Sequence, residues 1–173
     1  MHTPELLRRI DRDWRAACPT LDPTPMRRII ALRRAASILG QAVESVYAHS
    51  GLNSPAFDLL LTLRRSGPTE GLAPGELAAL MAVAPASVTN RIDRLEARGL
   101  VVRDLDPHDR RSWRVRLTQA GHALINELLP LHVQNEARLL AALSEDEQAL
   151  LEDLLVRLTH AAETARAADE GSQ

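Results

Sequence analysis

The chain has 173 residues, of which 45% are hydrophobic and 25% are charged, and its formal net charge at pH 7 is -2. These proportions suit one soluble domain with one buried core and leave little room for a second domain. No apolar run approaches the roughly 18 to 20 residues that a membrane-spanning helix needs, and charged residues fall where a signal peptide would need an apolar stretch. We therefore expect a cytoplasmic protein with no membrane segment.

The charges are unevenly distributed along the chain. Residues 91–116 contain eight arginines and five acidic residues, whereas residues 144–173 contain eight acidic residues and two arginines. The net charge alone would not favour binding to nucleic acid, but a local basic segment does.

The spacing of apolar residues predicts six or seven helices and one short β-hairpin. A first helix covers residues 1–17 and stops before Pro19. Ser144 and Glu147 form a capping box that starts the last helix, and we expect residues 167–173 to be disordered. The helices predicted between these two cover residues 26–49, 54–65 with Ser54 as N-cap, 74–81, 85–98 and a long segment from 118 that Pro130 interrupts.

Residues 54–117 have the pattern of a winged helix-turn-helix. The helices at 74–81 and 85–98 are separated by a three-residue turn, which suits a helix-turn-helix. Two strands, 100–103 and 113–117, then flank a polar turn and form the wing. The fold class that we expect is therefore mainly α with a small β-hairpin wing.

The helix at 85–98 has the two faces that a recognition helix needs. Val88, Ile92 and Leu95 recur at spacings of four and three residues, so they define its buried face. At about 100° per residue, small and hydrogen-bonding side chains lie on the other side, where they could contact base edges in the major groove. The residues expected to meet DNA on this helix are Ala86, Ser87, Thr89, Asn90 and Arg94.

The predicted wing adds a second group of candidate DNA contacts. Arginines cluster at the hairpin, where such a side chain can enter a narrow minor groove. The alternative is a solvated turn in which Asp106 and Asp109 pair with these arginines. The wing arginines are Arg110, Arg111 and Arg114.

Several motifs match a known family. They are T-N-R-I-D-R-L-E from Thr89, G-L-V from Gly99, D-P-H-D-R-R from Asp106 and L-T-x-x-G from Leu117. With this spacing the chain resembles the MarR family of regulators over residues 26–158. The resemblance implies a homodimer formed by residues 26–50 and 118–166, whose paired recognition helices bind a pseudo-palindrome in double-stranded DNA. Regulators of this family usually repress transcription, and an effector ligand weakens their DNA binding.

A second set of motifs resembles the urate-responsive, HucR/PecS-like subgroup of that family. It consists of D-W-R from Asp13, L-D from Leu21, F-D-L-L-L-T-L-R-R-S-G-P from Phe57 and H-x-x-N-E from His132. The subgroup adds an N-terminal helix, here residues 1–17, and the resemblance implies a site for urate or a related anionic purine. The ligand residues of the subgroup correspond here to Trp14, Asp58, Arg91 and Arg103.

Two of these four residues can also be interpreted from their own surroundings. Asp58 interrupts the apolar run 56–61, and a buried carboxylate there would need a cationic neighbour. Arg91 lies about 60° from the centre of the buried face of its helix, so it is aimed at the protein body and could pair with Asp58. An anionic purine would then take Arg91 or Arg103 as counter-ion, stack on Trp14 and repel Asp58.

Each candidate also has a purely structural interpretation. Trp14 would anchor the N-terminal helix, Asp58 and Arg91 would form a structural ion pair, and Arg103 would contact a DNA phosphate. Trp113 in the wing either packs against the domain or stays exposed beside the DNA backbone.

Other functions have less support in the sequence. The lone Cys18 would allow peroxide sensing on the same fold, but Pro19 follows it directly and only Arg15 is near to lower the thiol pKa. The six histidines show no paired spacing for a metal, and no phosphate loop, nucleophile elbow or metal-ligand motif indicates an enzyme or a cofactor. A dimeric scaffold that does not bind DNA is the alternative from another class.

Overall fold

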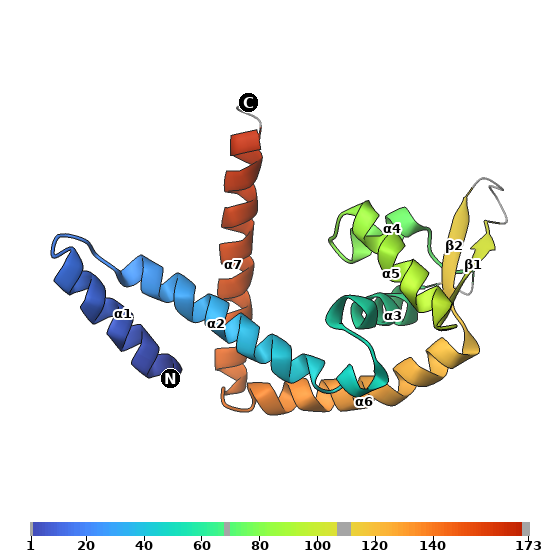
Figure 1. Ribbon diagram of the computed structural model, residues 1–173, viewed down its shortest axis with the longest axis horizontal. Helices are drawn as coiled ribbons and strands as arrows, with labels where there is room; N and C mark the ends of the chain where they lie inside the picture. The colour runs from blue at the N-terminus through green and yellow to red at the C-terminus, as the bar shows by residue number, and fades with distance from the viewer. Residues whose placement is uncertain (1, 68–69, 107–111, 171–173) are drawn as a thin grey trace. The chain divides into compact units, whose positions relative to one another are not determined.

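The computed structural model describes residues 2–67, 70–106 and 112–170. Within this part of the chain, helices and one antiparallel hairpin follow one another along the sequence (Figure 1), so the expected class, mainly α with a small β-hairpin, is confirmed. The elements are α1 (Thr3–Ala17), α2 (Thr24–Glu44), the short 3-10 helix η1 (Ala48–Ser50), α3 (Ser54–Ser66), α4 (Pro74–Leu80), α5 (Pro85–Ala97), β1 (Val101–Leu105), β2 (Trp113–Leu117), α6 (Gln119–Leu140) and α7 (Glu145–Glu170).

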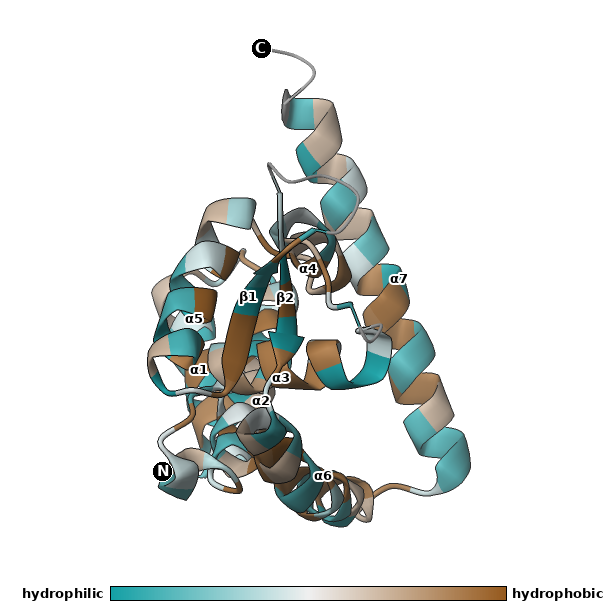
Figure 2. Ribbon diagram, turned by 90° about the vertical axis from the view of Figure 1, so that its right-hand side faces the viewer, coloured by the Kyte–Doolittle hydropathy of each residue, from teal (hydrophilic) through white to brown (hydrophobic). Residues whose placement is uncertain are grey.

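The chain packs as two compact units, Met1–His132 and Val133–Gln173. The first unit holds α1 to α5, the hairpin, most of α6 and the buried core. The second unit holds α7 and the C-terminal part of α6. Hydrophobic residues alternate with hydrophilic ones along α7 (Figure 2). Among the described helices, none combines the length and the hydropathy that crossing a lipid bilayer requires.

The core lies where α3, α4, α5, the hairpin and the first part of α6 meet. The predicted stripe on α5 is confirmed, because Val88, Ile92 and Leu95 are 0%, 1% and 1% exposed. Full burial of such a side chain contributes about 1.5 to 3 kcal/mol relative to leaving it exposed, so this stripe fixes which face of α5 turns inward. Side chains from the other elements that complete the core include Leu59, Leu60, Leu77, Val101, Val115, Ile125 and Leu128.

The hairpin pairs with the segment of the chain that precedes α4 in sequence. Leu72 forms a bridge with Val115 of β2 through two backbone hydrogen bonds of 2.8 and 2.9 Å. Gly71 has a φ of 85°, and a Cβ at this position would lie 2.5 Å from the carbonyl oxygen of Val115. This close approach requires glycine. The predicted second strand, 113–117, has the observed bounds, while the first begins and ends later than the predicted 100–103.

Side-chain caps define the starts of the last two helices. The Thr118 hydroxyl accepts a hydrogen bond of 3.0 Å from the N–H of Gly121 at the start of α6. Ser144 and Glu147 form the predicted capping box at the start of α7, with reciprocal hydrogen bonds of 3.3 and 2.8 Å.

The predicted helix at 26–49 is wrong at its C-terminal end, because α2 stops at Glu44. Tertiary packing of Tyr47 explains the difference. Its ring is 2% exposed and stacks on Phe57 with ring centroids 4.0 Å apart, and its hydroxyl donates to Ser54 Oγ at 2.9 Å. These contacts require the chain to leave the helix before Tyr47, which overrides the local helical pattern.

Three further boundary details differ from the sequence-based expectation. The N-cap of α3 is Asn53, whose side chain accepts a 3.0 Å hydrogen bond from the N–H of Ala56, and Ser54 is already helical. α6 continues through Pro130, which removes one backbone donor but does not end the helix. Residues 167–170, expected to be disordered, extend α7, in keeping with their alanine-rich sequence.

The N-terminal helix is linked to α2 by polar contacts. Asp11 lies 2.9 Å from Arg15 on its own helix and 3.5 Å from Arg27 on α2, and the guanidinium of Arg34 donates to Thr3 Oγ1 at 2.8 Å. The hydrogen bond from Arg15 holds the pKa of the Asp11 carboxyl below its usual value.

Candidate nucleic-acid interface

α4 and α5 form the predicted helix-turn-helix. The turn between them is closed by a 3.0 Å hydrogen bond from the N–H of Val83 to the carbonyl of Ala78, and Ala82 in the turn has a φ of 52°. The first turn of α4 is fixed by Glu76, whose carboxylate accepts a 2.7 Å hydrogen bond from the N–H of Ala73. The backbone of the motif is therefore held at both ends of α4.

The face of α5 opposite the buried stripe is open and polar. Its side chains supply a hydroxyl, an amide and a guanidinium, the groups that contact base edges and phosphates. Small residues at the start of the helix would allow close approach to a groove. Of the predicted helix contacts, Ser87 is half-buried and the exposed ones are Ala86, Thr89, Asn90 and Arg94.

Arg91 is half-buried and lies between the buried stripe and this face. Together with Asn90 and Arg94 it lines a cavity of about 250 Å³, to which Asn53 and Pro55 at the start of α3 also contribute. Two arginines therefore line one cavity beside the N-terminal end of a helix, an arrangement that favours an anionic group.

The predicted pair between Asp58 and Arg91 is wrong. Asp58 is exposed and lines a different cavity, of about 480 Å³, with Arg64 and Arg65, and no ion pair joins it to Arg91 in the part of the chain that the structure describes. An exposed carboxylate is hydrated, so it does not need the buried counter-ion that the apolar run suggested.

Arg103 fastens the wing to the recognition helix. From β1 its guanidinium forms ion pairs with Asp93 and with Glu96 on α5, the latter at 2.7 Å, and its backbone N–H donates to Glu96 at 3.3 Å. The side chain of Arg103 is 27% exposed, so this double pair is partly shielded from solvent. We call the Arg103, Asp93 and Glu96 side chains the wing clamp.

Arg114 is engaged within the protein rather than turned outward. It donates to Asp106 at 2.7 Å and to the carbonyl of Gly71 at 2.7 Å, and its guanidinium lies 3.6 Å from Glu76. The hydrogen bond to Asp106 raises the pKa of Arg114 above its usual value. The geometry favours the alternative interpretation, in which an acidic residue of the turn pairs with this arginine and fixes the base of the wing.

The tip of the wing lies outside the described residues, which end at Asp106 and resume at Ser112. Arg110 and Arg111 fall in this gap, and their contact with the minor groove stays a prediction.

Trp113 is partly packed against the domain and partly exposed, so each of the two interpretations of its sequence position holds in part. Its side chain is 50% exposed, and its neighbour across the hairpin, Leu105, is 53% exposed. Trp113 also lines a cavity of about 520 Å³ with Thr89 of α5 and Arg103 of β1. The ring therefore borders the space between wing and recognition helix while one part of it faces solvent.

None of the cavities described among the placed residues is lined by more than one of the four predicted ligand residues. Asp58, Arg91 and Arg103 each line a separate cavity. Trp14 on α1 is 36% exposed and lines none of the described cavities. Cys18 directly after α1 is also exposed, and peroxide sensing through it stays a prediction.

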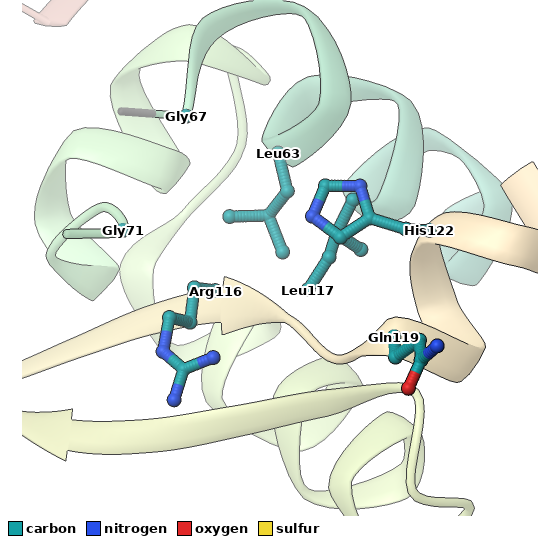
Figure 3. A pocket seen from close by; sticks show the side chains of 7 residues that line it. All are labelled: Leu63, Gly67, Gly71, Arg116, Leu117, Gln119 and His122. Carbon is teal, nitrogen blue, oxygen red and sulfur yellow. The ribbon is translucent and has the colours of Figure 1, made fainter. Parts of the chain in front are cut away.

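A further cavity, of about 490 Å³, lies between α3, β2 and the start of α6 (Figure 3). The imidazole of His122 lies beside Leu63 and Leu117, while the guanidinium of Arg116 points away from them and pairs with Asp104 (Figure 3). This cavity contains none of the predicted site residues.

The acidic members of the wing clamp were missed in the sequence. Asp93 and Glu96 enter the sequence analysis only as letters of the motif T-N-R-I-D-R-L-E. Their spacing of three residues puts two carboxylates side by side on a helix that is followed almost immediately by an arginine-bearing strand. That combination of an acid pair and a neighbouring strand arginine is the signal that could have revealed the clamp.

Comparison with known proteins agrees with this geometry. A model of the MarR family matches residues 50–112. The HTH-type transcriptional regulator PecS of Dickeya dadantii is 36% identical over 149 residues, which are 86% of this chain and 90% of PecS.

Two solved structures extend the similarity to the fold. BpsR of Bordetella bronchiseptica, from work on the regulation of its DNA binding by 6-hydroxynicotinic acid, is 30% identical with a TM-score of 0.65 over 74% of this chain and 95% of BpsR. MosR of M. tuberculosis in complex with DNA is 28% identical with a TM-score of 0.65 over 80% of this chain and 97% of MosR. The chain belongs to the MarR family, whose members are DNA-binding transcription regulators of the winged helix-turn-helix type and not enzymes.

Proposed function

We propose that the protein acts in the cytoplasm as a homodimeric repressor, which binds a pseudo-palindromic operator in double-stranded DNA and leaves it when a planar anion binds. Urate or a related purine is the ligand that we propose. The observation that carries the DNA part of the proposal is the exposed polar face of α5 beside a wing clamped to the same helix.

The proposed contacts with DNA come from α5 and from the wing. Asn90 and Arg94 suit base edges in the major groove, with Ala86, Ser87 and Thr89 allowing close approach. Arg91, which shares a cavity with Arg94 at the start of α3, is proposed as a counter-ion for the anionic ligand and not as a DNA contact. Arg110 and Arg111 are proposed for the minor groove, while Arg114 is proposed to position the wing.

Exposed apolar faces support the proposed homodimer. α2 exposes Ile29 to 54% and Ile38 to 48%, and α7 exposes Leu150 to 56% and Leu158 to 55%. Apolar surface of this extent on long helices is costly in water and is typical of helices that a partner chain covers. The predicted dimerisation segments, 26–50 and 118–166, include these helices.

The wing clamp suggests how an anionic ligand could weaken DNA binding. Arg103 is already neutralised by Asp93 and Glu96, so an anion that takes Arg103 as counter-ion must displace both carboxylates. The wing would then lose its hold on α5, and two free carboxylates would face the phosphates of DNA. The similarity to BpsR, whose DNA binding was studied with 6-hydroxynicotinic acid, favours a ligand with a planar anionic ring.

The proposal is tested by ligand-induced release from DNA. A labelled duplex selected by the wild-type protein from a random-sequence pool is bound at fixed salt, and urate, 6-hydroxynicotinate and uncharged caffeine are titrated in while fluorescence anisotropy is followed. We expect urate to release the duplex and caffeine to have no effect. Trp14→Phe and Arg91→Ala should each require at least about tenfold more urate, or about 1.4 kcal/mol, whereas Arg8→Ala, which removes an exposed arginine of α1, should not.

The outcomes separate the two parts of the proposal. Failure of the wild-type protein to enrich any duplex would refute DNA binding. Release by 6-hydroxynicotinate alone would replace urate by another planar anion, and a complex that survives saturating concentrations of both anions would refute the effector.

A further inference from the structure

The C-terminal end of α5 is a rigid point of the recognition helix. It forms a Schellman motif, in which the N–H of Gly99 donates to the backbone carbonyl of Glu96 at 2.8 Å and the N–H of Leu100 donates to the backbone carbonyl of Leu95 at 3.0 Å. Gly99 has the left-handed φ of 67° that this motif requires. Arg98 is the residue between the helix and this glycine, so its backbone is fixed.

The Arg98 side chain reaches across to the segment between α2 and α3. Its guanidinium donates to the carbonyl of Ser50 at 2.7 Å and to the carbonyl of Gly51 at 2.9 Å. Gly51 has a left-handed φ of 71°, and the guanidinium atoms lie 3.8 to 3.9 Å from the position that a Cβ of Gly51 would take. One planar group therefore donates to two consecutive carbonyls and packs over the glycine, which a lysine could not reproduce.

The segment that contains Ser50 and Gly51 is held in place by contacts of its own. Ser50 Oγ donates to the carbonyl of Tyr47 at 2.6 Å, and the Tyr47 ring stacks on Phe57 of α3. Phe57 in turn meets His132 of α6 edge to face, with ring centroids 4.9 Å apart. Arg98 therefore ties the end of α5 to the place where α2, α3 and α6 meet.

Small rotations at this end of α5 would be magnified at the other. The helix has 13 residues, which at about 1.5 Å per residue gives a length of about 20 Å. A tilt of about 10° about the C-terminal end would move its N-terminal residues by about 3 Å, which exceeds the tolerance of a hydrogen bond to a base edge. The N-terminal half carries Ala86, Thr89 and Asn90.

We propose that Arg98 is a positioning residue for DNA recognition, which fixes the direction of α5 by tying its C-terminal end to the carbonyls of Ser50 and Gly51. This inference rests on the proposed reading of DNA by the exposed face of α5. It assigns to Arg98 no contact with DNA, in contrast to Arg94, and no place in the core, since the residue is exposed.

Affinity for DNA and its salt dependence separate this role from the two alternatives, a phosphate contact and general stability. Wild-type protein, Arg98→Ala, Arg98→Lys and the charge-matched control Arg8→Ala are titrated with the selected duplex at several salt concentrations, and hydrogen exchange of residues 48–52 is followed. We expect about tenfold weaker binding for Arg98→Ala, clearly weaker binding for Arg98→Lys, and a change below about twofold for Arg8→Ala. The slope of log affinity against log salt should stay that of the wild type, and exchange at 48–52 should become faster.

Three results would overturn the inference. Arg98→Ala could bind as Arg8→Ala does, or its salt slope could fall by about 0.9, which is the signature of a lost phosphate contact. Arg98→Lys could bind DNA as tightly as the wild type, which would indicate a phosphate contact, because such a contact needs only the positive charge. The same variant tests the inference if Arg98→Ala does not fold. If the wild-type protein enriches no duplex, the proposed function fails as well, and that outcome is distinct from the other three.

Discussion

Replacing Arg103 by alanine should lower the free energy of unfolding by about 1 kcal/mol, because the wing loses its ion pairs with the recognition helix. The two ion pairs of the wing clamp join side chains that are 27%, 53% and 37% exposed for Arg103, Asp93 and Glu96. Partly exposed pairs of this kind contribute about 0.2 to 1 kcal/mol each, because solvent screens the charges and ordering two long side chains costs entropy. Two pairs sharing one guanidinium therefore give a total near the middle of that combined range.

Urea denaturation at one fixed protomer concentration measures this loss, since the stability of a dimer depends on concentration. With a slope of about 2 kcal/mol per molar urea, a loss of 1 kcal/mol lowers the midpoint by about 0.5 M. A double-mutant cycle with Glu96→Gln should give a coupling free energy of about 0.5 kcal/mol or more. A coupling indistinguishable from zero would show that the clamp does not hold the wing, and the proposed route from ligand to DNA release would lose its basis.

Three further predictions follow from the described contacts. Gly71→Ala should destabilise the protein by about 2 kcal/mol or more, because the left-handed φ and the carbonyl 2.5 Å away both oppose a Cβ, while Gly75→Ala in the open first turn of α4 should not destabilise it; thermal unfolding of the two variants is compared. Arg114→Ala should speed hydrogen exchange in β2 and weaken DNA binding without lowering the salt slope, and a lowered slope would instead assign this arginine to a phosphate. Because the pKa of Asp11 is lower in the folded state, the contacts of its carboxylate stabilise the protein above about pH 4 and are lost as the pH falls below that value. The fluorescence of Trp14, measured in a Trp113→Phe background, should report this loss. The substitution Asp11→Asn should abolish the transition.

Local physics made much of the fold predictable from the sequence. The stripe on α5 repeats at four and three residues, so burial on one face follows from the helical period alone. Gly99 and Thr118 occupy positions where a left-handed residue and a side-chain acceptor are required, and both perform these roles.

Side-chain partners between distant elements were not predictable in the same way. The apolar run around Asp58 suggested burial, yet this residue lies about 140° from the centre of the buried face of α3, and the helical period of that face would have shown its exposure. For Arg114 the sequence indicated only Asp106, in the adjacent turn, as a partner. Its partners Gly71 and Glu76 are about 40 residues away in sequence, and only the bridge between Leu72 and β2 brings them together.

The same limit applies to the effector site. Each of the four ligand residues was identified by resemblance, and each lies on a different element, so their arrangement depends on tertiary and quaternary packing that periodicity does not contain. The protomer places three of them at separate cavities. The wing clamp, which includes Arg103, is the feature on which the proposed effect of the ligand rests.

The most direct test of the account is the affinity of Arg94→Ala for the selected duplex, measured beside Arg8→Ala at the same salt concentration. A side chain that contacts a base or a phosphate from the exposed face of α5 should contribute about 1 to 3 kcal/mol, so binding of Arg94→Ala should be weaker by about fivefold or more, while Arg8→Ala should bind nearly as the wild type does. Equal affinities of the two variants would contradict the claim that this face of α5 reads DNA.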